Sequence, residues 1–142
     1  MRALLCTALI ALTACAAAPA THAGSLVDIA VVDRDTGQTL RTYAQHGKVY
    51  VAGMPGHRYS VRMTNRTGAR VLTVLSVDGV NAITGQTASP NQSGYVLSPW
   101  ESAEIAGWRK SDNEIAQFNF TSLPDSYASR TGRPANVGLI GV

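Results

Sequence analysis

Apolar and polar side chains alternate with a period of two along most of the chain after residue 25. Residues 59–64 show the pattern most clearly, because Tyr59, Val61 and Met63 fall on one side of an extended segment and polar residues fall on the other. Glycine, asparagine, aspartate and proline interrupt the pattern at about the spacing of strands in a sandwich or barrel. The pattern predicts an all-β fold, a single β-sandwich of immunoglobulin-like or related type.

The interrupted pattern defines the individual elements. The predicted strands cover 26–32, 39–45, 48–52, 59–64, 70–77, 94–97, 103–108, 114–121 and 136–142. Asp33–Gly37 is a turn signal that joins the first two strands as a hairpin. Residues 70–77 are almost continuously apolar, which predicts a central strand covered on both faces. Residues 78–91 are rich in Gly, Asn and Thr and predict a long loop, and residues 125–129 predict one helical turn.

The first residues have the pattern of a secretion signal. Met1 and Arg2 precede an apolar and small-residue run from Ala3 to Leu12. This run is too short for a membrane-spanning helix, which needs about 20 residues. We therefore expect a cleaved signal and no membrane helix in this segment.

Leu12-Thr13-Ala14-Cys15 follows the apolar run and resembles the bacterial lipobox at all four positions. The resemblance implies that Cys15 is lipidated and becomes the mature N-terminus. Because Ala16 follows the cysteine, it also implies an outer-membrane lipoprotein that faces the periplasm. Stable anchoring would then need more than one acyl chain.

These observations predict three parts: a signal segment at 1–15, a flexible tether of small residues at 16–25, and the β-sandwich domain at 26–142. A second interpretation remains open. Small residues also allow a general signal peptidase to cut after Ala20 or Ala23, which would release a soluble periplasmic protein.

Composition narrows the possible partners. The 142-residue chain has a formal net charge of +3, and of its 12 Lys and Arg residues only Arg2 lies in the signal, so 11 remain against 9 acidic residues. This balance does not indicate a nucleic-acid partner. The two cysteines are Cys6 and Cys15, so the predicted domain has no disulfide and must be stabilised by packing. No sequence motif indicates a cofactor.

Several short segments that together span most of the predicted domain form a recognisable set. They are Tyr59-Ser60-Val61-Arg62, Asn65-Arg66-Thr67-Gly68, Ser76-Val77-Asp78-Gly79-Val80-Asn81, Gly94-Tyr95-Val96-Leu97, Gly107-Trp108-Arg109-Lys110, Ser126-Tyr127-Ala128 and Arg130-Thr131-Gly132. This set resembles a group of exported proteobacterial proteins of unknown function. The resemblance implies export and a globular domain. It implies no activity.

Two groups of residues could bind a metal ion, and both lack ligands. Asp33 and Asp35 resemble the start of a calcium loop but have no third acidic ligand nearby, and a hairpin turn explains them equally well. His46 and His57 lie at strand ends and could meet across a sheet edge, but a third zinc ligand is missing from the local sequence. We predict no metal site.

The candidate ligand-binding residues fall into two groups. Asp78 and Asn81 lie in a polar loop after an apolar strand, where binding residues are common and where turn chemistry also favours Asp and Asn. The second group could form an aromatic and basic surface and comprises Tyr95, Trp108, Arg109, Arg130 and Arg133. The alternative for this group is that Trp108 fills the core while its neighbours face solvent.

Two functions are compatible with the sequence. The first is a non-enzymatic envelope protein, held to the membrane by its N-terminal lipid, that binds or supports an envelope protein or glycan. The second is a small periplasmic hydrolase or carbohydrate-active domain in which Asp78 works with Glu101 or Glu104, because glycoside hydrolysis needs two carboxylates about 5 to 10 Å apart. No nucleophile motif supports the second function, so we expect the first.

Overall fold

The computed structural model describes residues 21–23 and 26–142 and confirms the all-β prediction, with antiparallel sheets in a sandwich-like arrangement. Helix within these residues is limited to α1, Tyr127–Arg130, and a 3₁₀ turn, η1, Pro134–Asn136. No helix in the described part of the chain is long and apolar enough to cross a membrane. The predicted signal, Cys15, and tether residues 16–20 and 24–25 lie outside the described residues.

The described strands are short, as expected for a small sandwich. They are β1 Thr21–Ala23, β2 Val27–Asp33, β3 Thr42–Gln45, β4 Lys48–Val51, β5 Arg58–Asn65, β6 Val71–Thr73, β7 Ser76–Val77, β8 Val80–Asn81, β9 Tyr95–Leu97, β10 Ser102–Ile105, β11 Gly107–Arg109, β12 Ile115–Asn119 and β13 Ile140–Gly141. Residues 21–23 of the predicted tether therefore form a strand, which pairs with β2.

The largest sheet is built around β5. β2 pairs with one edge of β5 over seven residues, with Val31 opposite Val61, and β10 and β12 share the other edge. The predicted alternation in β5 is confirmed, because Tyr59, Val61 and Met63 are buried on one face. This face supplies much of the core.

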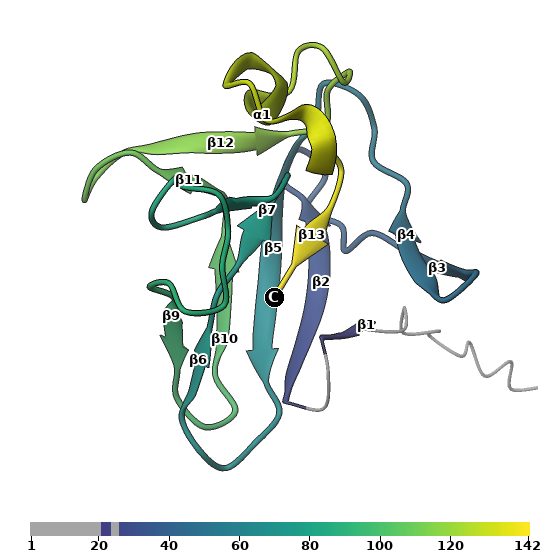
Figure 1. Cartoon of the computed structure of the whole chain (residues 1–142). Coiled ribbons are helices and arrows are strands. Elements are labelled where there is room, and N and C mark those ends of the chain that lie inside the picture. The colour runs from purple at the N-terminus through teal and green to yellow at the C-terminus, as the bar shows by residue number, and fades with distance from the viewer. Residues whose placement is uncertain (1–20, 24–25) are drawn as a thin grey trace, which may run out of the picture.

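The second layer consists of two small sheets, β6–β9 and β13–β7–β8. Figure 1 shows β7 and β13 in front of β5 and β2, so these strands cover the large sheet. The core joins the layers, since Val61 and Met63 of the large sheet belong to one buried cluster with Val77, Val80 and Leu97 of the small sheets. Burial of this apolar surface is the main stabilising contribution.

The prediction of a single central strand at 70–77 was wrong. The segment forms β6 and β7, which belong to different sheets. Leu72 in the middle of β6 is 60% exposed, so this part of the segment is not covered on both faces. An apolar run shows that a segment can be buried, but it does not show where the chain changes sheets. β5 is the central strand instead.

The hairpin predicted between 26–32 and 39–45 is limited to one bridge, in which Val32 lies opposite Thr39. The rest of that predicted pairing was wrong. β2 pairs with β5, and β3 pairs with β4 in an arm that points away from the sheets in Figure 1. His46 and Gly47 both have positive φ in its two-residue turn, which is the geometry of a type I′ hairpin.

Four further predictions needed smaller corrections. The strand at 103–108 is interrupted at Ala106, where pairing moves from β5 to β12, and the predicted loop at 78–91 contains β8. The final strand covers only Ile140–Gly141. The helical turn predicted at 125–129 is present as α1 and begins two residues later.

Candidate functional site

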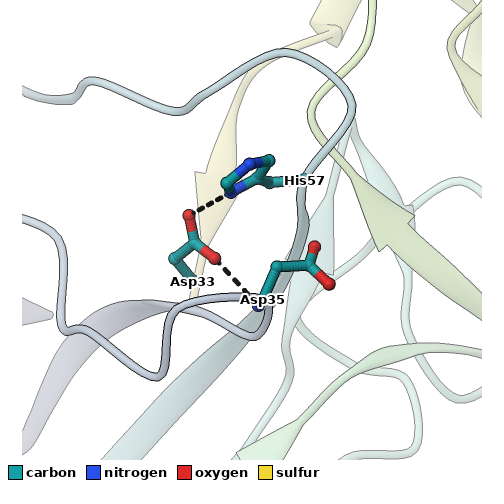
Figure 2. A group of neighbouring side chains, drawn as sticks. All are labelled: Asp33, Asp35 and His57. Atoms are coloured by element: carbon teal, nitrogen blue, oxygen red, sulfur yellow. Dashed lines mark hydrogen bonds and ion pairs between the residues drawn. The ribbon is translucent and has the colours of Figure 1, made fainter.

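The first candidate group joins the turn after β2 to the start of β5. Asp33 Oδ1 accepts hydrogen bonds from the backbone N–H groups of Asp35 (2.9 Å) and Thr36 (3.0 Å). Asp33 Oδ2 lies 2.7 Å from Nδ1 of His57, which comes from a segment 24 residues away, as Figure 2 shows. The predicted turn is therefore confirmed, and Asp33 holds it to the chain ahead of β5.

The charges in this group are balanced by local partners. Burial alone would raise the pKa of Asp33, but hydrogen bonds from His57 and from the turn N–H groups outweigh it and lower that pKa. The guanidinium of Arg58 binds Asp35 through Nε at 2.9 Å and lowers the pKa of that carboxyl group. Both carboxylates are thus held in the charged form.

This group also contains residues from both sets of possible metal ligands that the sequence offers. One ligand atom from each of Asp33, Asp35 and His57 lies within 4.8 Å of the others, whereas His46 lies at the tip of the β3–β4 arm. The oxygen atoms already accept hydrogen bonds from His57, Arg58 and the turn backbone. These contacts fix the turn after β2 to the start of β5, and Asp33, Asp35, His57 and Arg58 are together called the clasp. The geometry gives no separate indication of a bound ion.

The second candidate site is a cavity of about 870 Å³ between β11, β12, α1 and the β7–β8 turn. Its size lies within the range of small-molecule sites in proteins, about 300–1,000 Å³. The aromatic and charged side chains of its lining include Asp78, Trp108, Phe120, Asp125, Tyr127 and Arg130.

Aromatic rings form one wall of this cavity. The Trp108 ring stacks on Tyr127 with centroids 4.7 Å apart and meets Phe118 edge-on at 4.6 Å. Phe120 stacks on Tyr59 at 4.4 Å. Trp108 is only 5% exposed while Tyr127 is 37% exposed, so the wall runs from the core to the rim.

Helix α1 places two side chains at the rim. Ser126 caps it, since its Oγ accepts a hydrogen bond from the Ser129 backbone N–H at 3.2 Å, and Ala128 anchors it in the core. Tyr127 and Arg130 are three residues apart and lie on one side of the helical turn. The cap thus fixes an aromatic ring and a cation together.

Asp78 also lines the cavity and lies in the β7–β8 turn. Its φ of 56° and that of Gly79, 73°, form a tight turn, and Asp78 Oδ1 accepts a hydrogen bond from the Gly138 backbone N–H at 2.8 Å. Burial raises the pKa of Asp78. Burial, assisted by the charge of Asp78, also raises the pKa of Tyr59.

The structure brings three of the seven predicted ligand-binding residues to the cavity: Asp78, Trp108 and Arg130. The interpretation that Trp108 fills the core is confirmed, since it is buried while Arg109 beside it is exposed. The buried indole also lines the cavity, but of the five residues of the predicted aromatic and basic surface only Trp108 and Arg130 do so.

The other four predicted residues do not line the cavity. Asn81 is buried and holds its own loop, accepting hydrogen bonds from the backbone N–H groups of residues 83 and 84. Arg133 donates a hydrogen bond to the Gly85 carbonyl. Tyr95 is half-buried in β9, where burial raises its pKa, and Arg109 is exposed on β11.

The carboxylates suggested for hydrolysis lie in different environments. Glu101 accepts a hydrogen bond from the backbone N–H of Ser98, and Glu104 binds Ser60 and Arg62. Neither glutamate is among the residues that line the cavity with Asp78. The geometry gives no support for a catalytic pair formed by Asp78 with either one.

Sequence reasoning missed Phe120, Asp125 and Tyr127 as site residues. Phe118 of β12 and Phe120 just after it are two positions apart, and this spacing is a signal of burial but not of a site. Tyr127 and Asp125 lie in a segment without periodicity, so only the three-dimensional packing of α1 on Trp108 reveals them.

The fold and the cavity together define a class: a small all-β protein with a partly aromatic cavity of the size of small-molecule sites. The chain matches no family model, no curated protein and no solved structure. The residues themselves must therefore carry the functional argument.

Proposed function

We propose that this chain is a non-enzymatic module of a bacterial cell envelope that binds an envelope glycan in the aromatic cavity. The observation that carries this proposal is the combination of Trp108, Phe120 and Tyr127 with polar and charged side chains around one cavity of about 870 Å³. Aromatic rings offer flat apolar faces to sugar C–H groups, while the polar side chains orient hydroxyl groups.

The envelope address in this proposal rests on the N-terminal sequence. A charged start, an apolar run and the Leu12–Cys15 box support export with lipidation at Cys15 and attachment to the outer membrane. Mass spectrometry of the protein purified from cells tests the address. A diacylated N-terminus at Cys15 is expected, whereas an unmodified N-terminus after Ala20 or Ala23 would indicate a soluble periplasmic form.

Sedimentation with two purified envelope glycans, insoluble peptidoglycan sacculi and lipopolysaccharide, tests the binding function. We expect the protein to sediment with one of them and Tyr127→Ala to reduce binding about tenfold, because this change removes the most exposed aromatic ring of the wall. Arg109→Ala is the matched control, since Arg109 is exposed and does not line the cavity.

Failure to bind either glycan, or equal loss with both variants, would contradict the proposal. Mass spectrometry of the recovered glycan addresses the hydrolase alternative in the same experiment. Unchanged glycan is expected, and cleavage products that require Asp78 would favour the hydrolase instead.

A further inference from the structure

The β3–β4 arm exposes apolar side chains that the core does not cover. Figure 1 shows it pointing away from the sheets, and a two-stranded hairpin on its own is at best marginally stable in water. Tyr43 and Val49 are each 52% exposed and Tyr50 is 48% exposed. Of the apolar side chains in β3 and β4, only Val51 at the base packs against the core. The described residues therefore leave an apolar surface on the arm without cover.

Aromatic rings and a cation share one face of the arm. Tyr43 lies opposite Tyr50, and Gln45 lies opposite Lys48 two positions further along the ladder. Directly opposite residues share a face of a sheet, and so do residues two positions apart on one strand. Both tyrosines and Lys48 are therefore on the same face, which combines apolar rings, hydroxyl groups and an ammonium group.

The arm is basic and contains no compensating acid. Between Asp35 and Asp78 the sequence has no Asp or Glu, and the arm carries Arg41 at its base and Lys48 near its tip. No ion pair with either of these two side chains occurs among the described residues, whereas both arginines of β5 have a carboxylate partner. Charge complementarity therefore favours an anionic partner.

The arm segment begins at the edge of β2 to which the N-terminal strand also pairs. β5 occupies one edge of β2 along its whole length, so β1 and the start of the arm segment share the other. The pairing of β1 ends at Ile29, and the Leu40 backbone N–H donates to the Val31 carbonyl, two residues further along β2. Cys15 is six residues before β1, so it lies within about 20 Å of it whatever the path of the chain. A lipid on Cys15 would keep a membrane within reach of the arm, which selects a lipid surface among anionic partners.

Resting on the lipidated address proposed above, we infer that the β3–β4 arm docks on an anionic phospholipid surface beside the lipid anchor. Arg41 and Lys48 bind lipid phosphates, while Tyr43 and Tyr50 lie at the headgroup level, where amphipathic rings are favoured. The contact orients the domain on the membrane. It is separate from the cavity, whose lining includes no residue of β3 or β4.

Tryptophan fluorescence of the protein purified from cells and reconstituted in vesicles tests this inference. Tyr50→Trp places a reporter on the arm, and Val96→Trp is the matched control, because Val96 is 50% exposed and lies in β9, across the molecule from the arm in Figure 1. Both changes are made together with Trp100→Phe, so that the remaining native tryptophan is the buried Trp108. In vesicles of phosphatidylcholine and phosphatidylglycerol with brominated acyl chains, we expect quenching of the reporter on the arm and none of the control.

Removal of the two cations tests the role of charge. Arg41→Gln combined with Lys48→Gln should shift the docking equilibrium about 30-fold towards the free arm, about fivefold for each charge, and so remove most of the quenching. Arg109→Gln combined with Lys110→Gln is the matched control, since it removes two exposed cations outside the arm and should leave the quenching unchanged.

Three results would overturn the inference: no quenching of the reporter on the arm, equal quenching of both reporters, or quenching that survives the loss of both arm cations. An emission shift of the arm reporter that follows protein concentration without vesicles would assign the arm to a second copy of the chain. A shift with lipopolysaccharide and none with the vesicles would assign it to a glycan. Either of these shifts would also contradict docking on phospholipid.

This test is independent of the glycan-binding test, because the vesicles contain no glycan and the arm does not line the cavity. If mass spectrometry finds the form cut after Ala20 or Ala23, the lipidated address fails and the soluble protein is mixed with the same vesicles in excess. Quenching of the arm reporter would then still support docking, and its absence would overturn it.

Discussion

Single residues explain how the first turn is fixed and how it should respond to acid. The pKa of Asp33 is lowered below its ordinary value of 3.8 in the folded protein, so its interactions with His57 and the turn stabilise the fold above the unfolded-state pKa. This contribution is lost as the pH falls through the lower, folded-state value. Acid should therefore weaken the clasp.

Asp33→Asn tests this account, because it preserves an acceptor for the turn and removes the charge facing His57. We expect a lower urea midpoint than wild type at pH 7 and a smaller fall between pH 5 and pH 2. Asp112→Asn is the control, since Asp112 is exposed. Parallel pH profiles for the wild type and Asp33→Asn would show that the clasp does not contribute to stability.

At the scale of elements, the position of Trp108 depends on the close approach of β11 to β12. A Cβ atom on Gly107 would lie 2.3 Å from the Ala116 carbonyl oxygen, a distance that real structures do not show. Gly107→Ala must therefore displace backbone, and we expect it to cost about 1–3 kcal/mol of unfolding free energy and to weaken glycan binding.

Gly68→Ala is the matched control for this change, because a Cβ there meets nothing within 4 Å. Its unfolding free energy should stay within about 0.5 kcal/mol of wild type. Urea denaturation of both variants provides the measurement. Equal midpoints for Gly107→Ala and wild type would mean that the β11–β12 spacing is not limiting.

Elements also show what the sequence can predict. The alternation of β5 and the Asp33–Gly37 turn signal have local causes, so both were predicted correctly. Pairing partners are set by contacts between distant segments, which is why the β2–β5 pairing and the division of 70–77 were missed. The cavity itself was not predicted, and of the predicted binding residues only Asp78, Trp108 and Arg130 line it. Tyr127 was missed because it reaches the cavity through the packing of α1 on Trp108.

For the whole molecule, packing has to stabilise the fold without disulfides, because the described residues contain no cysteine. The two cysteines fall outside the predicted domain, and a buried cluster connects the two layers. The aromatic rings at one end of that cluster continue into the cavity wall, so core and candidate site share residues. Changes in the site are therefore expected to affect stability as well as binding.

Intermolecular nuclear Overhauser effects between the protein and a bound glycan fragment test the assignment of the glycan to the cavity, because they identify the ring that contacts the sugar. We expect effects from the ring protons of Tyr127 to sugar ring protons. Effects confined to Tyr43 and Tyr50, the exposed pair on the β3–β4 arm, or to Trp100 would place the glycan elsewhere and contradict the assignment of the cavity.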